Sequence, residues 1–190
     1  MSALEKWLTR RPLITDGAWG TELQARGLEP GTLPDTWNLE YPDRVESVAR
    51  AYVEAGSEVI LTNTFRSNTV TLAEAGLAEK LVELNRAAVE ISRRAAKATG
   101  ALVFASMGPT GKMLMMGEVT AEAVTEAFTA QARALAEAGA DALLIETMGD
   151  VEEGKLAVAA AKTTGLPVVA SFAFDTGKNC DRTLMGAKPE

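Results

Sequence analysis

A helical segment, a glycine and a short apolar run follow one another four times along this sequence. The glycines that close the helical segments are Gly56, Gly100, Gly139 and Gly165. A glycine just past a helix can adopt the left-handed conformation that turns the chain back toward a sheet. Because each apolar run is short and lies between helices, it is typical of a parallel strand covered on both faces. This alternation predicts an α/β fold.

The pattern predicts five strands and four long helices. The strands are expected near 12–16, 57–62, 101–106, 141–146 and 167–173, and the helices near 43–55, 78–98, 121–138 and 151–163. Two helices carry apolar faces at helical spacing, formed by Leu77, Leu81, Leu84, Ala88, Ile91 and Ala95 and by Val124, Phe128, Ala132 and Leu135. We assign both faces to the core. Asp150 and Glu153 have the spacing of a capping box, which predicts the start of the last helix.

Polar residues of different kinds lie at or just after the predicted strand ends, namely Asp16, Thr62, Ser106, Glu146 and Asp175. A ring of varied chemistry at successive strand ends is typical of the catalytic face of a (β/α)8 TIM barrel. No Gly-x-Gly-x-x-Gly or Walker loop follows a strand, which disfavours an open nucleotide-binding sheet. A barrel of this type needs about 250 residues. We therefore expect residues 1–190 to be the N-terminal part of one, with about the first five β/α units, truncated after the fifth strand and its following loop.

Composition excludes several classes of protein. A net charge of −7 argues against a nucleic-acid partner. No apolar run approaches the roughly 20 residues of a membrane span, and the first residues lack a signal-peptide core, so no membrane association is expected. One cysteine and no histidine exclude an internal disulfide and a complete Cys/His zinc site within the chain. The same count predicts a reducing, cytoplasmic environment.

Two of the predicted strands run directly into a carboxylate. The apolar run 12–15 is followed by Asp16, and the run 142–145 is followed by Glu146. Ligands of α/β proteins bind beyond the carboxyl ends of parallel strands, so these acids are suited to hold a cationic group of a small molecule. Two alternatives stay open, because Asp16-Gly17 is also a common turn pair and Glu146 could form an ordinary salt bridge at the strand end.

Five motifs in series carry a resemblance to a known family, namely Asp16–Thr21, Leu61–Phe65, Gly108–Gly111, Ile145–Met148 and Asp181–Gly186. Their order and spacing over nearly the whole chain resemble the homocysteine S-methyltransferase family, which includes cobalamin-dependent and betaine-dependent enzymes. Trp19 and Leu61 are mild departures from the pattern, which often has Met and Glu there. The resemblance implies a (β/α)8 barrel in which zinc binds the sulfur of homocysteine, and a methyl group is transferred to that sulfur to give methionine.

The resemblance also implies residues that bind the substrate. Asp16 and Glu146 match the acids that hold the ammonium group of homocysteine. Backbone amides around Gly17 and in the loop formed by Thr62, Asn63, Thr64 and Phe65 are expected at its carboxylate. The implied partners are homocysteine and a methyl donor of the methylcobalamin, betaine or S-methylmethionine class, with cobalamin or folate entering through the donor.

The family's zinc ligands are three cysteines that lie in later segments, and none of those segments is present here. We therefore expect no metal ligand in this chain. Cys180 precedes a motif that lies upstream of the family's sixth strand, so we interpret it as a loop residue.

Three functions stay open at this stage. The first is a homocysteine methyltransferase with this chain as the front part of its barrel. The second is a non-catalytic remnant or amino-acid-binding module without the zinc site. The third is an unrelated barrel enzyme that works with carboxylates alone, such as a Mg-dependent lyase.

Weaker candidates are Gly108–Gly111 for a pocket rim, Met113–Met116 for a surface that receives a methyl-donor module, and Lys112 and Arg182 for a carboxylate. A plain loop, ordinary packing and solvated charges are the respective alternatives. Open barrel edges would also favour self-association.

Overall fold

A computed structural model describes residues 7, 9 and 12–189. The strands are β1 (Val59–Leu61), β2 (Leu102–Met107), β3 (Ala142–Met148) and β4 (Val168–Phe172). The α-helices are α2 (Trp19–Ala25), α3 (Trp37–Glu40), α4 (Pro42–Glu54), α5 (Thr69–Glu74), α6 (Leu81–Ala96), α7 (Ala121–Glu137) and α8 (Val151–Lys162). Short 3-10 turns are η1 (Pro34–Thr36), η2 (Ala78–Lys80) and η3 (Leu114–Met116).

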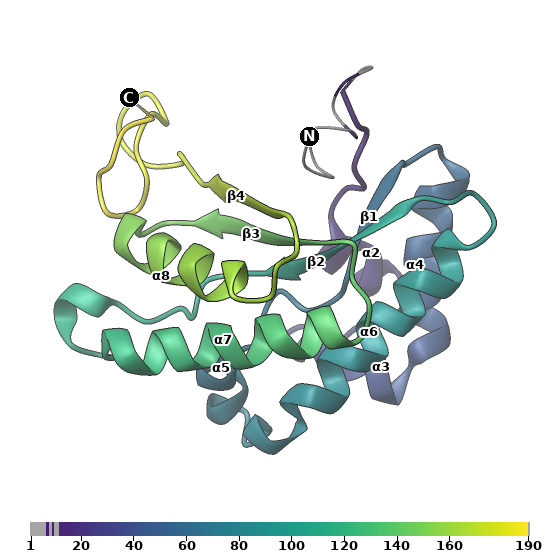
Figure 1. Cartoon of the computed structure of the whole chain (residues 1–190), viewed down its shortest axis with the longest axis horizontal. Helices are drawn as coiled ribbons and strands as arrows, with labels where there is room; N and C mark the ends of the chain where they lie inside the picture. The colour runs from purple at the N-terminus through teal and green to yellow at the C-terminus, as the bar shows by residue number, and fades with distance from the viewer. Residues whose placement is uncertain (1–6, 8, 10–11, 190) are drawn as a thin grey trace.

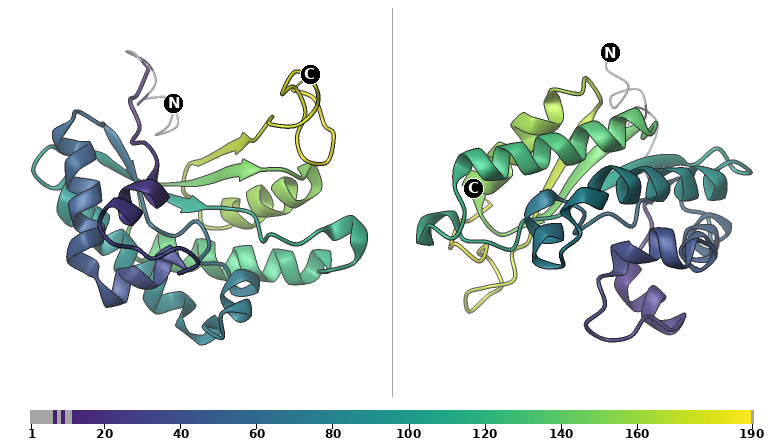
Figure 2. Two further views of the ribbon diagram at one scale, coloured as in Figure 1. Left: turned by 180° about the vertical axis from the view of Figure 1, so that it is seen from behind. Right: turned by 90° about the horizontal axis from the view of Figure 1, so that it is seen from below.

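The strands form one parallel sheet in the order β1-β2-β3-β4, and a helical segment connects each strand to the next (Figure 1). Neighbours in the sequence are therefore neighbours in the sheet, as they are in a β/α barrel. Helices α6, α7 and α8 lie along one side of the sheet, and both further views in Figure 2 agree with this placement. The predicted α/β fold is confirmed.

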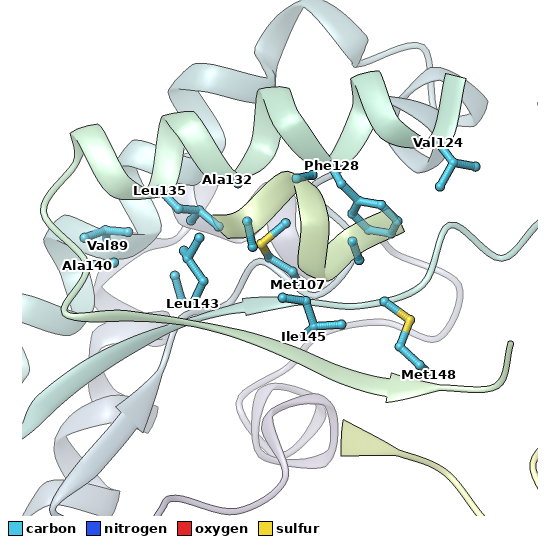
Figure 3. Packing of buried hydrophobic residues seen from close by; sticks show 14 residues of the cluster. Val89, Met107, Val124, Phe128, Ala132, Leu135, Ala140, Leu143, Ile145 and Met148 are labelled. Atoms are coloured by element: carbon cyan, nitrogen blue, oxygen red, sulfur yellow. The ribbon is translucent and has the colours of Figure 1, made fainter. Parts of the chain in front are cut away.

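The main core lies between the sheet and the helices. Side chains of β3 alternate, so that Leu143 and Ile145 are fully buried against α7 while Leu144 is only half-buried on the opposite face. Figure 3 shows Phe128 and Leu135 of α7 packed toward these residues. Burial of each such side chain contributes roughly 1.5–3 kcal/mol. The apolar faces predicted on α6 and α7 are buried here and in neighbouring clusters, with Leu77 partly buried.

The segment predicted as a first strand, 12–16, is shorter in the structure than expected. Thr15 forms a single parallel bridge with Val59. Backbone hydrogen bonds of 3.1 Å run from Val59 N to Ile14 O and from Asp16 N to Val59 O. The segment thus runs beside β1 in the expected direction but makes too few ladder contacts to count as a strand. The prediction of five strands is therefore wrong within residues 12–189, where four strands are formed.

The capping box predicted at the start of α8 is half wrong. Asp150 is the N-cap, and its carboxylate accepts a hydrogen bond of 2.8 Å from Glu152 N. Glu153 does not return a bond to the cap. Its side chain is instead buried, and Oε1 accepts bonds from Thr110 N at 2.7 Å and from Thr110 Oγ1 at 2.6 Å. A tertiary partner has replaced the local one.

Within residues 7, 9 and 12–189, none of the helices combines the length and apolar character that crossing a membrane requires.

Candidate substrate-binding site

A cavity of about 260 Å³ opens at the carboxyl end of the sheet. Its walls come from the segment after Asp16, the 3-10 turn η1, the loop after β1, and the ends of β2 and β3. The lining residues are Gly17, Ala18, Trp19, Gly20, Pro34, Asp35, Leu61, Thr62, Asn63, Phe65, Arg66, Ser106 and Glu146. This is the end of a parallel sheet at which α/β proteins bind small ligands.

Asp16 is held beside this cavity by two donors. Its Oδ2 atom accepts hydrogen bonds of 2.8 Å from Leu61 N, at the end of β1, and from Trp19 Nε1. Its Oδ1 atom is buried and has no hydrogen-bond partner within the described part of the chain. Burial raises the pKa of this carboxyl group, against the lowering effect of its hydrogen bonds to Leu61 and Trp19. A buried carboxylate oxygen without a donor is suited to accept one from a ligand.

Glu146 lies near the end of β3 and accepts a hydrogen bond from the hydroxyl of Ser106 on β2. Burial raises its pKa, and the negative charge of Asp16 raises it further. The two acids predicted from the sequence are therefore close enough to interact electrostatically. A cation bound between them would compensate the two buried negative charges and remove the repulsion between them.

A bulge in β3 surrounds Glu146. Ile145 pairs with Ala170 and Met148 pairs with Phe172, so β3 has one more residue than β4 between these pairs. Thr147 has a φ of 62°, which is rare for a β-branched residue. Bulges change the direction in which a strand's side chains point, and such strained residues cluster at functional sites.

In the loop after β1, the polar side chains of Thr62, Asn63 and Thr64 are already engaged in hydrogen bonds within the protein. The hydroxyls of Thr62 and Thr64 lie 2.6 Å apart, Thr62 Oγ1 accepts from Ser106 N at 3.0 Å, and Thr64 Oγ1 donates to Ser106 O at 2.7 Å. Asn63 Nδ2 donates to Pro34 O at 2.8 Å. Gly17, Thr62, Asn63 and Phe65 line the cavity, whereas Thr64 is fully buried and is not among the lining residues.

Two charged residues that the sequence analysis missed also line the cavity. Asp35 is only 1% exposed, and its Oδ1 atom accepts hydrogen bonds from Arg66 N at 3.0 Å and from Ser67 Oγ at 2.6 Å. Burial raises the pKa of Asp35 to about 6. Neither Asp35 nor Arg66 follows an apolar run directly, so no local pattern marks them.

The weaker candidates lie elsewhere. Pro109 and Gly111 line a second cavity of about 280 Å³, together with Met113, and are not among the residues lining the first cavity. Lys112 forms an ion pair with Glu74. The Arg182 guanidinium lies 3.9 Å from Asp181, and both side chains are about half exposed.

The residues present do not fit a zinc site. In the described ranges, no three His, Cys, Asp or Glu side chains are grouped so that they could hold a metal ion. Cys180 is exposed in the loop after β4 and does not line the cavity. Zinc sites usually have three or four nitrogen or sulfur ligands, so we derive no chemical step through a metal.

The fold and the cavity together define a class: a parallel β/α protein of the barrel type, with two acids beside a cavity at the carboxyl end of its sheet. Residues 13–190 match the homocysteine S-methyltransferase family, and the chain belongs to that family.

Two curated relatives are mycobacterial methionine synthases. The chain is 34% identical to the enzyme of Mycobacterium tuberculosis, over 95% of this chain and 16% of that protein. It is 35% identical to the enzyme of Mycobacterium leprae, over 80% of this chain and 13% of that protein. The chain thus spans less than a fifth of either relative.

A solved structure is similar over a larger share. The metallated form of the homocysteine methyltransferase MmuM from Escherichia coli has a TM-score of 0.79 and 28% sequence identity. The match covers 97% of this chain and 70% of that chain. The four parallel strands and their helices therefore correspond to part of a TIM barrel, as the sequence predicted.

Proposed function

We propose that this chain is the homocysteine-binding front part of a barrel that transfers a methyl group to the thiol of homocysteine and so forms methionine. In this reaction the sulfur gains a bond to the methyl carbon, the bond between methyl and donor breaks, and the thiol proton is released. Membership of the family supports the proposal. The single observation that carries it is the buried, unpartnered Oδ1 of Asp16 beside Glu146 at the ligand-binding end of the sheet.

In this proposal Asp16 and Glu146 accept hydrogen bonds from the substrate ammonium group. Charge-assisted hydrogen bonds of this kind contribute roughly 1.5–3 kcal/mol each. Backbone amides around Gly17 and in the loop 62–65 face the carboxylate. The methyl donor and the zinc ligands belong to parts of the barrel outside this chain. The proposed setting is cytoplasmic, since one cysteine is consistent with a reducing compartment.

The test uses Asp16→Asn and Glu146→Gln, each made in the intact protein. Both changes keep the shape of the side chain and remove a charge that faces the ammonium group. We expect each to lower kcat/KM for homocysteine about tenfold to a hundredfold. Glu137→Gln, on the 71% exposed side chain near the end of α7, is the matched control and should leave kcat/KM unchanged. Unchanged kinetics of Asp16→Asn or Glu146→Gln would assign that acid a structural role.

A second candidate function is a non-catalytic module that binds an amino acid, because Asp16 and Glu146 beside the cavity could hold an ammonium group without any metal. Calorimetry with L-homocysteine, combined with methionine formation from betaine, S-methylmethionine or methylcobalamin, separates the two functions. Binding of homocysteine without turnover from any of the three donors would support the module and contradict the enzyme.

A further inference from the structure

The charges around the first cavity are unevenly distributed. Asp35 and Glu146 line it, and Asp16 lies beside it. Among its described lining residues, Arg66 is the single cation. A ligand that carried only a positive charge would have no use for this arginine, whereas a zwitterion would find a partner for each of its charges.

The backbone of Arg66 is fixed by the acid across the cavity wall. Arg66 N and the hydroxyl of the next residue, Ser67, both donate to Asp35 Oδ1, at 3.0 and 2.6 Å. Because Asp35 is almost completely buried, this anchor is shielded from water, which strengthens it. The position from which the Arg66 side chain starts is therefore well defined.

The guanidinium of Arg66 is not engaged. Arg66 is exposed, and in the parts of the chain that the structure describes its guanidinium forms no hydrogen bond and no ion pair, although its charge acts on Asp35 and on the exposed Glu74. Other arginines are paired, such as Arg26 with Glu22 at 2.6 Å and Arg94 with Glu46 at 2.8 Å. Its planar fork of donors matches a carboxylate, with which arginine commonly forms two parallel hydrogen bonds.

We propose that the Arg66 guanidinium binds the α-carboxylate of the amino-acid substrate and makes the cavity selective for α-amino acids over simple amines. The inference rests on the proposed function and deepens it, because it names a determinant of substrate class. Backbone amides alone can donate hydrogen bonds to any acceptor group, whereas a cation opposite two acids requires that the ligand carry both charges.

The experiment is isothermal titration calorimetry of the intact protein with two ligands. These are L-homocysteine and 3-aminopropanethiol, which keeps the amine and the thiol but lacks the carboxylate. We expect Arg66→Gln to weaken homocysteine binding about tenfold to a hundredfold and to leave the affinity for 3-aminopropanethiol unchanged. Asp16→Asn should weaken the binding of both ligands. Arg133→Gln, on the 79% exposed side chain of α7, is the matched control and should change neither.

Each result has a separate meaning. If the unaltered protein binds homocysteine and Arg66→Gln binds it equally well, the role of Arg66 is wrong while the proposed function stands. If Arg66→Gln weakens both ligands equally, Arg66 supports the site structurally and the inference is overturned. If the unaltered protein does not bind homocysteine, the proposed function itself fails. Arg66→Lys keeps the charge without the fork and should recover part of the selectivity.

Discussion

At the scale of single residues, buried acids are the feature that most separates the site from the rest of the chain. Asp16, Asp35, Glu146 and Glu153 all have a pKa that burial raises above its usual value. A carboxylate held away from water lowers stability unless something compensates its charge. Three of these acids surround one cavity, and acids with raised pKa values in a cavity are typical of functional sites.

The pH dependence of stability provides a test at Asp35. Its pKa is about 6 in the folded chain against 3.8 as the ordinary value, so the folded state holds the proton more tightly. The free energy of unfolding should therefore fall as pH rises from about 4 to about 6. Asp35→Asn keeps the acceptor oxygen for Arg66 N and Ser67 Oγ and removes the charge. It should raise the free energy of unfolding at pH 7 by roughly 1–3 kcal/mol and have little effect at pH 4.

Urea denaturation of the intact protein at both pH values measures this difference. The exposed Asp175→Asn serves as the control and should shift both values equally. If the free energy of unfolding changed equally with pH in the unaltered protein and in Asp35→Asn, Asp35 would not be the group responsible.

At the scale of elements, the loops after β1 and β2 are fitted against each other. Gly108 N donates to Phe65 O at 3.0 Å. A side-chain carbon at Gly108 would lie 2.6 Å from that carbonyl oxygen and from two ring atoms of Phe65. On the far side of the same loop, Thr110 is tied to Glu153 of α8. The loop after β2 is thus held in place by two neighbouring units of the fold.

The close approach at Gly108 yields a prediction for a single methyl group. Gly108→Ala should lower the free energy of unfolding by about 1–3 kcal/mol, because a backbone oxygen cannot move aside as a side chain can. It should also weaken homocysteine binding, since Phe65 lines the cavity. Gly20→Ala in α2 is the control for stability, because no atom beyond its chain neighbours and its own helix backbone lies within 4 Å of the added carbon. Thermal melts of both variants decide the matter, and a Gly108→Ala protein as stable as Gly20→Ala would contradict the predicted contact.

At the scale of the whole molecule, both edges of the sheet are incompletely covered. β3 is mostly buried, whereas the outermost strand β4 has only half-buried or exposed residues. At the other side, the segment around Thr15 makes a single bridge to β1. Exposed strand edges offer unpaired backbone groups to other chains. A closed barrel would cover both edges.

We therefore predict that the 190-residue chain, produced alone, self-associates or populates an expanded state. Size-exclusion chromatography with light scattering, together with a thermal melt, tests this. A monodisperse monomer of about 20.1 kDa with a sharp cooperative transition would contradict the prediction and the truncated-barrel proposal behind it.

Much of the fold could be predicted because it is encoded in local patterns. Apolar residues such as Leu84 and Phe128 recur at helical spacing, and a buried position requires nothing more specific than an apolar side chain. Asp16 and Glu146 could be singled out because each interrupts an apolar run at its end. The short first strand was overestimated for a similar reason, since an apolar run shows which residues favour a strand and not how many of them find a partner.

The amino-acid sequence by itself determined the alternation of strands and helices, the faces that they bury and two of the acids at the site. Only the tertiary structure decided that the Glu153 side chain bonds to Thr110 instead of the start of its own helix. It also decided that Asp35 anchors the backbone of Arg66, and that Asp35 and Arg66 line the same cavity as Glu146. The physical reason is distance along the chain. The Asp35–Arg66 contact joins residues 31 apart and the Thr110–Glu153 contact joins residues 43 apart, so neither follows from a repeating local pattern. Such contacts form only when packing of the elements brings the two segments together.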